Sequence, residues 1–381
     1  MAAGWLTASL ALALFTLPVQ AQTGAGTGAR IETEAQTKAL KPADATADDQ
    51  AIAALALTAH SAPRHRAFAA AGRALQQALA VPCQTWHTTN AEHITEAFTQ
   101  IVRAHAGLEH WRPQAPRPGV TGRSGRLIVW PAPGLAQKVE RLLEARAARR
   151  LNLADIRMLG RSLRSLSALE VVLFAARAGG ATPRLRPSSP ASCAYARGVA
   201  DHVAQVAAAR LRQWQPGQPG AVGALAWRNS TTNASGRHAR TTHRLIQLFD
   251  AGLRQVRDDR LARSLGLTRP RRPRLEPPFQ RSGLALVVMR ANIVALHSLY
   301  VETKLATLTP QAARTVKRHL SRALLIVDEI IASRIDPFAS GQPSNPLIDL
   351  GVPLKMARHI GTATLAAATD LERFAQAGGQ R

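Results

Sequence analysis

Residues 161–174 have the sequence RSLRSLSALEVVLF, which places a carboxylate, Glu170, where a core residue is expected. We expect residues 153–178 to form one helix. Side chains on a helix advance by about 100° per residue, so Leu159 and Leu173 share one apolar stripe with Glu170. Burying a bare carboxylate is costly. Glu170 therefore either escapes at a helix edge, pairs with an arginine, or belongs to a polar site inside the fold.

The rest of the sequence also favours helices. The chain has 381 residues, enough for two ordinary domains, and only 4% aromatic residues. Alanine and leucine recur at helical spacing, which favours helix bundles over β-sandwiches. We predict an all-α protein with two four-helix-bundle-like domains packed together, residues 51–215 and 224–375, separated by the Pro/Gly-rich seam 215–223. Residues 51–80 are expected to form one helix or two, and the other expected helices are 91–111, 134–150, 153–178, 192–214, 239–264, 280–306, 310–333 and 350–373.

The N-terminal segment predicts export. Residues 5–18 form an apolar run followed by Val-Gln-Ala, which is typical of a secretory signal and its cleavage site. We predict a signal peptide over 1–21 and a small, polar, disordered tether over 22–50. The apolar run is short for a membrane span, so we expect none in the mature chain and an exported, periplasmic location.

Cysteine content and charge narrow the function classes. Cys83 and Cys193 are the two cysteines, which in an exported protein predicts one disulfide; two buried thiols are the alternative. The formal charge is +25, almost entirely from arginines spread along the chain. No recognition helix or aromatic-interleaved basic motif accompanies that charge, so we do not expect nucleic-acid binding. Weak attraction to an acidic polysaccharide or a membrane surface stays open.

Several polar side chains around the helix at 280–306 are candidate site residues. Arg290 and His297, seven residues apart, lie on one helix face and either are tucked in the core or face Glu170. Ahead of this helix, residues 281–283 combine a guanidinium, a hydroxyl and a helix N-terminus, which suits an anion or simply fixes the loop.

A second candidate pair lies earlier in the chain. His105 and Glu109 are four residues apart and share a helix face, which permits a metal or an exposed polar pair. Four other histidines have no partner pattern, and we expect them at the surface: His60, His65, His87 and His93.

Four stretches carry a resemblance through their order and spacing. They are HAGLEHWRPQAPRPGVTGRSGRLIVWPAPG (105–134), SLRSLSALEVVLF (162–174), CAYARGVADHVAQVAAARLRQW (193–214) and FQRSGLALVVMRANIVALHSLY (279–300). Together they resemble the imelysin-like family of exported bacterial proteins. The resemblance implies two related all-α bundles with a functional site between them. Members are linked to iron uptake and to metal or acidic-sugar binding, and some are classed as metallopeptidases.

The family's G-x-H-x-x-E motif is matched only in part. Glu170 stands at the Glu position, Ser165 at the Gly position and Ser167 at the His position. A His and a Glu three apart can share a cation, whereas a serine hydroxyl is a weak, neutral ligand. The resemblance also implies ligand-binding roles for Arg123, Arg281, Ser282 and Gly283, the last three matching the family's RSG signature.

These observations lead to one expected function and two alternatives. We expect an exported protein that binds a metal- or iron-related or small anionic ligand between two helical bundles, in iron uptake with other periplasmic or envelope components. The expected cofactor is a divalent metal or iron, held by Glu170, His105 and Glu109. The missing motif histidine and the absence of an H-E-x-x-H pattern favour a non-enzyme. The alternatives are an imelysin-type metallopeptidase and a polyanion-binding scaffold.

Overall fold

Helices make up the described part of the chain, which confirms the predicted all-α class. Among the described residues the β pairing is limited to an isolated bridge between Phe174 and Leu185. The computed structural model describes residues 50–111, 127–128, 133–145, 153–176, 184–185, 189–215, 234–267, 276–334, 337–338, 348–359 and 361. The predicted signal peptide and tether at 1–49 lie outside these residues.

The helices before the predicted seam begin with one long element. Residues 50–78 are continuously helical, and a π-helical segment, η1 (Ala56–Ser61), leads directly into α2 (Ala62–Ala78). Pro63 follows this segment. Because proline has no backbone N–H to donate to the preceding turn, its position agrees with the local change from α-helical to π-helical hydrogen bonding. The other elements are η2 (Cys83–Thr85), α3 (Ala91–Ala106), α4 (Leu135–Ala145), α5 (Leu153–Met158), η3 (Arg161–Arg164), α6 (Leu166–Leu173) and α7 (Pro190–Gln213).

The single helix predicted over 153–178 is wrong. The chain leaves the helix after α5 and restarts at Ser165, whose extended backbone (φ −104°, ψ 161°) and side chain cap α6. The backbone N–H of Leu166 donates to the Leu127 carbonyl at 2.7 Å, outside any helix. The apolar stripe expected from Leu159 to Glu170 is therefore interrupted by this break in the helix. Glu170 is buried because every residue of α6 is buried.

The second half of the chain is arranged around α10 (Ala285–Glu302). Among the described helices, α10 alone is apolar and long enough to span a membrane by composition. It is 61% buried within the fold, as expected of a core helix. The other elements are α9 (Ala234–Arg254), η4 (Gln255–Ala262), η5 (Leu305–Leu308), α11 (Pro310–Ala332) and the helical residues 348–359.

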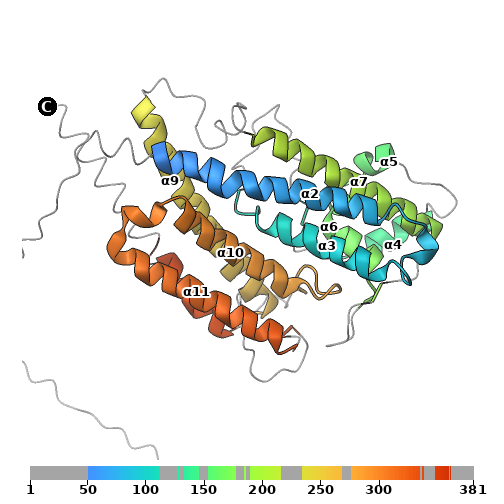
Figure 1. The fold of residues 1–381 in the computed structure, drawn as a ribbon. Helices are drawn as coiled ribbons and strands as arrows, with labels where there is room; N and C mark the ends of the chain where they lie inside the picture. Colours follow the sequence, from blue (N-terminus) through green and yellow to red (C-terminus); the bar gives the residue numbers. More distant parts are fainter. Residues whose placement is uncertain are drawn as a thin grey trace, which may run out of the picture. The chain divides into compact units, whose positions relative to one another are not determined.

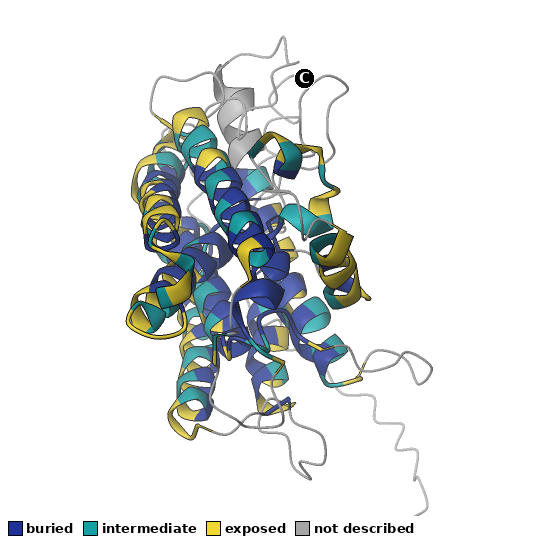
Figure 2. Ribbon diagram, turned by 90° about the vertical axis from the view of Figure 1, so that its right-hand side faces the viewer, coloured by how far each residue is buried: buried dark blue, intermediate teal, exposed yellow. Residues whose placement is uncertain are grey.

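Helices from both sides of the predicted seam pack on one another. In Figure 1, α2 runs alongside α7, and α10 lies between α11 and α3. The α2 and α7 helices approach closely because small residues face each other: a Cβ at Gly72 would lie 3.1 Å from the Ala204 Cα. The apolar faces turned inward form one continuous core, and the exposed faces turn outward (Figure 2). The division into two bundles at residues 215–223 stays a prediction.

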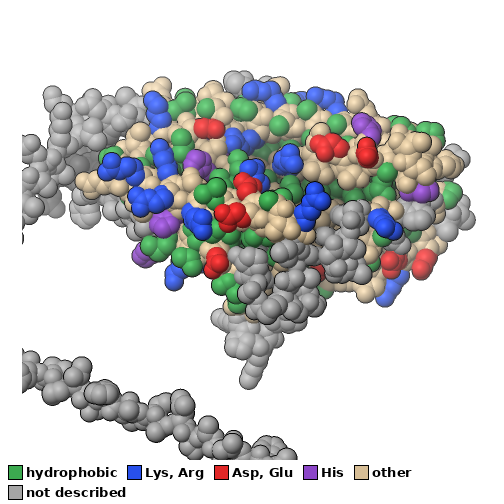
Figure 3. Space-filling view, turned by 60° about the horizontal axis from the view of Figure 1, so that its bottom comes forward, with side chains coloured by type: hydrophobic (Ala, Val, Ile, Leu, Met, Phe, Trp, Pro, Cys, Tyr) green, Lys and Arg blue, Asp and Glu red, His purple; other side chains and the backbone are tan. Residues whose placement is uncertain are grey.

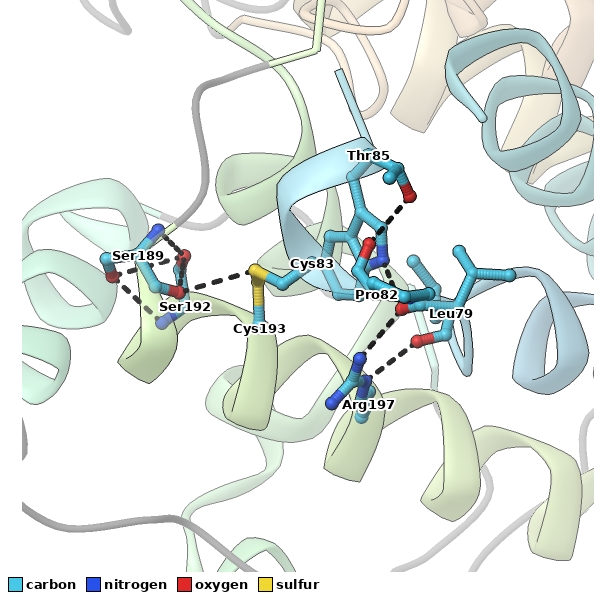
Figure 4. Close-up of a disulfide and its surroundings, with 10 residues drawn as sticks. Leu79, Pro82, Cys83, Thr85, Ser189, Ser192, Cys193 and Arg197 are labelled. Carbon is cyan, nitrogen blue, oxygen red and sulfur yellow. Dashed lines mark hydrogen bonds between the residues drawn. A yellow bond between two sulfur atoms is a disulfide. The ribbon is translucent and has the colours of Figure 1, made fainter. Parts of the chain in front are cut away.

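The predicted disulfide is present. Cys83 and Cys193 are bonded across 110 residues, with Cα atoms 6.1 Å apart, and join the start of η2 to α7 (Figure 4). Arg197, one turn further along α7, donates to the carbonyls of Leu79 and Val81 at 2.8 Å each. These carbonyls follow the end of α2, so the arginine satisfies acceptors that a helix terminus leaves open.

Candidate functional site

Glu170 meets Ser282 inside the fold, and this contact defines the candidate site. Both the backbone N–H and the hydroxyl of Ser282 donate to Glu170 Oε1 at 2.8 Å. The two side chains are each 5% exposed. Glu170 precedes the predicted seam and Ser282 follows it, so the site joins segments 112 residues apart.

A tight turn ahead of α10 aims Ser282 at the carboxylate. Leu284 N donates to the Phe279 carbonyl at 2.8 Å, and the Ser282 hydroxyl lies 3.3 Å from the same carbonyl. Gly283 has φ +69°, a left-handed conformation that a glycine adopts without strain. The turn therefore presents two donors to one carboxylate oxygen.

The Glu170 carboxyl has a strongly shifted pKa. Burial raises the pKa of Glu170 from 4.5 to about 7, because the ionised form loses water. The hydrogen bonds from Ser282 and the charge of Arg281 lower the pKa, whereas Glu276 raises it, so burial is the dominant effect. Near neutral pH the site therefore holds a carboxyl group that can gain or lose a proton.

Three aromatic rings form a cluster that involves the segments carrying the site. Phe98 on α3 lies 5.2 Å from Phe174 and 6.0 Å from Phe279, measured between ring centroids. Phe174 directly follows α6, and Phe279 begins the turn that carries Ser282. All three rings are fully buried, so an apolar cluster connects α3 with the segments that carry Glu170 and Ser282.

The two motif serines have different surroundings. The Ser165 hydroxyl caps α6, accepting from Ala168 N at 3.1 Å and donating to the Ser162 carbonyl at 2.7 Å. Its hydroxyl is therefore engaged in the helix cap. Ser167 is buried and lies three residues before Glu170, so the two share a face of α6.

The predicted anion site at residues 281–283 contains an anion from the protein itself. Both donors of Ser282 point to the Glu170 carboxylate, and Arg281 acts on the same group through its charge. The sequence alternative in which these residues fix the loop agrees with this geometry.

Two other candidates lie elsewhere, and one cannot be placed. Arg290 is exposed and pairs with Asp328 of α11 at 2.5 and 3.2 Å, so it does not face Glu170. His297 is half-buried; burial and Lys317 lower its pKa, whereas Glu302 raises it. Arg123 lies outside the described residues.

His105 and Glu109 are buried, so the expectation of an exposed polar pair is wrong. They are 4% and 6% exposed. Glu109 forms an ion pair with Arg260 of η4 and accepts from Asn292 Nδ2 at 3.1 Å. His105 instead contacts the ring of Phe68 edge-on at 5.4 Å. The metal role predicted for His105 and Glu109 stays a prediction.

The sequence did not predict a buried pair of histidines, His60 and His110. His60 Nε2 lies 2.9 Å from His110 Nε2, and His60 Nδ1 lies 3.2 Å from the Ser298 hydroxyl. His65 is also buried, stacked on Trp214 at 4.9 Å. Burial lowers the pKa of His60 and of His65 to about 4, and that of His110 well below 6.5, so these imidazoles are neutral at pH 7.

The surface position expected for His60 and His65 is therefore wrong, whereas His87 and His93 are exposed as expected. Hydrogen bonds across 50 and 238 residues hold His60, and such partners leave no trace in local periodicity. The local sequence feature that could have drawn attention to His60 is Pro63, because a proline at this position indicates an irregular helix nearby.

The described residues do not supply a protein-only metal set. No group of three or more His, Cys, Asp or Glu side chains among them could hold a metal ion. At Glu170 the motif histidine is replaced by Ser167, which leaves one carboxylate and a neutral hydroxyl. Within the described residues, this site therefore lacks the ligands that a zinc-peptidase arrangement would need.

Comparison with known proteins identifies the family. No curated protein sequence matches the chain. An imelysin-like protein from Psychrobacter arcticum shares the fold, with a TM-score of 0.67 and 14% identity over 85% of this chain and 96% of that one. A protein named as a candidate iron-regulated protein A precursor from Parabacteroides distasonis does so with a TM-score of 0.63 and 13% identity over 84% and 95%. The family model for imelysin matches residues 61–345, well over half of the chain, and the chain therefore belongs to the imelysin family.

Proposed function

We propose that this imelysin-family protein is an exported, periplasmic binding protein that takes a cationic, metal- or iron-related ligand at Glu170. The observation that carries the proposal is a buried carboxyl group with only one oxygen engaged. Oε1 accepts both bonds from Ser282, and within the described residues Oε2 accepts none. A carboxylate oxygen without a donor is the group that a cation would complete.

The charge and hydrogen bonding at the site favour a cation over the small anion. An anionic ligand would need the two donors of Ser282, and both already bind Glu170. It would also meet a buried carboxylate, where like charges repel strongly. A cation would stabilise the ionised form of Glu170, which burial otherwise disfavours.

The ligand is expected to bring part of its own coordination sphere. Because no three-ligand group occurs among the described residues, a hydrated ion or an iron chelate suits the site better than a bare ion. The structural neighbour named as a candidate iron-regulated protein supports a connection with iron acquisition. The signal-like residues 5–18 support export.

Calorimetric titration tests the proposal. The purified protein is titrated with Mn²⁺ and, separately, with ferric citrate. We expect binding of at least one of them to the wild type, a loss of about tenfold or more in Glu170→Gln, and no change in Glu92→Gln. Glu92 is an exposed glutamate of the first turn of α3, so this control makes the same chemical change away from the site. Equal binding by all three proteins would contradict the proposal.

The two rival functions give different results. A metallopeptidase would cleave peptides in a chelator-sensitive reaction that Glu170→Ala abolishes. A polyanion-binding scaffold would bind heparin with steep salt dependence, and Glu170→Gln would leave that binding unchanged. Either result, without Mn²⁺ or ferric citrate binding, would replace the proposed function.

A further inference from the structure

A hollow on the surface lies between α2, α3, α10 and α11, away from the Glu170 contact. Its volume is about 450 Å³, within the range of small-ligand sites, which is about 300–1,000 Å³. Small residues create the space, because they leave neighbouring helices without side chains to fill it. The apolar part of the lining, or floor, includes Ala104, Gly107, Val287, Ala291, Val294 and Ile331.

Three arginines and one carboxylate also line the hollow: Arg64, Arg103, Arg290 and Asp328. Figure 3 shows hydrophobic side chains open to solvent between basic and acidic groups on the face turned to the viewer. Val294 of the floor is 37% exposed, which is unusual for a large aliphatic side chain on a helix that is otherwise mostly buried.

The arginines differ in whether their charge is already balanced. Arg64 donates to the Ser298 hydroxyl at 2.6 Å and lies 3.5 Å from Glu302. Arg290 is paired with Asp328. Arg103 is exposed, and its guanidinium makes no hydrogen bond or ion pair with the described residues. The hollow therefore combines an apolar floor with the guanidinium of Arg103, which is not paired with any residue that the structure describes.

We propose that this hollow binds an aliphatic monocarboxylate, with the alkyl chain on the apolar floor and the carboxylate on Arg103. The chemistry favours one negative charge over several, because Arg64 and Arg290 are already neutralised by Glu302 and Asp328. A guanidinium pairs with a carboxylate through two parallel hydrogen bonds, which gives orientation as well as affinity. The site is separate from Glu170 and does not depend on the function proposed for it.

Octanoate and 1-octanol are the probes, compared by calorimetry on the full chain. They share an alkyl chain and differ in charge. We expect octanoate to bind more tightly than octanol to the wild type. Arg103→Gln is expected to weaken octanoate binding by about threefold to tenfold and to leave octanol binding unchanged. Arg66→Gln is the matched control, because Arg66 is an exposed arginine of α2 that does not line the hollow.

A second variant is expected to improve binding, which a folding defect cannot imitate. Asp328→Asn removes the carboxylate that competes for Arg290, so octanoate affinity is expected to rise about threefold. Glu329→Gln, on the same helix but outside the hollow, is expected to have no effect.

Several outcomes would overturn the proposal. These are no octanoate binding, equal affinity for octanoate and octanol, or an equal loss in Arg66→Gln, which would indicate only the general positive charge. A wild-type dimer that Val294→Glu dissociates, measured by sedimentation, would show that a second copy of the chain covers the hollow instead.

Discussion

Replacing Glu170 by glutamine is expected to change how the stability of the protein depends on pH. Burial raises the pKa of this carboxyl from 4.5 to about 7. Between these two pH values the folded protein keeps the proton and the unfolded chain has lost it. Because the folded state binds more protons in this window, the free energy of unfolding falls as pH rises from 4.5 to 7.

The size of the effect follows from the difference in pKa. About 2.5 pKa units, at about 1.36 kcal/mol per unit, correspond to about 3 kcal/mol of lost stability in the wild type. Glutamine keeps an oxygen that can accept from Ser282 and does not titrate. Relative to the wild type, Glu170→Gln is therefore expected to gain about 3 kcal/mol between pH 4.5 and pH 8.

Urea unfolding at pH 4.5, 6, 7 and 8 measures this difference. The new buried amide adds an offset that does not depend on pH, so the change of the difference with pH is the informative quantity. The buried histidines titrate in both proteins and cancel in the comparison. Glu92→Gln, on the surface of α3, is expected to follow the wild type. A difference between Glu170→Gln and wild type that stays flat from pH 4.5 to 8 would refute the reasoning.

Three further predictions concern the disulfide, the buried ion pair and the neutral histidines. Reduction, or replacement of Cys83 and Cys193 by alanine, is expected to lower the free energy of unfolding by about 3–5 kcal/mol, since the closed loop is long; unchanged urea midpoints would contradict this. Arg260→Met removes one cation next to the buried Glu109 carboxylate, whose charge also acts on Arg210, and is expected to cost about 2–3 kcal/mol, with partial recovery when Glu109→Gln is added; an unchanged urea midpoint would contradict this. Folded His65 has a pKa of about 4, so below 6.5 the unfolded chain binds more protons and stability is lost as pH falls from 6.5 to 4. His65→Phe is therefore expected to reduce this decrease in the free energy of unfolding by about 2–3 kcal/mol, measured by urea unfolding at pH 6.5 and 4.5. A decrease equal to that of the wild type would contradict a buried neutral imidazole.

Local pattern predicted much of the fold because most helices here have strong apolar periodicity. It failed between residues 159 and 165, where apolar side chains continue at helical spacing and the backbone does not. The break is fixed by the Leu166 N–H bonding to Leu127 and by the Ser165 cap, one a distant contact and the other a local one. A serine at a helix start is a recognisable signal, and it was outweighed by the apolar spacing.

The sequence predicted which residues belong to the candidate site, but it did not predict how they contact one another. Glu170 and Ser282 were both identified from the sequence, yet Ser282 was considered as a donor to an external anion. The structure uses its two donors on Glu170 instead. The buried positions of His60 and Glu109 depend on partners 50 and 151 residues away, which a single sequence does not reveal.

Proton release on ligand binding tests the central claim most directly. If a cation binds the ionised form of Glu170, whose pKa is about 7, binding at pH 6.5 must displace the proton it carries. Calorimetric titration with Mn²⁺ in two buffers of different ionisation enthalpy gives the number of protons released. We predict release of roughly three quarters of a proton by the wild type at pH 6.5 and none by Glu170→Gln. Binding without proton release, or equal release by both proteins, would contradict a cation site at Glu170.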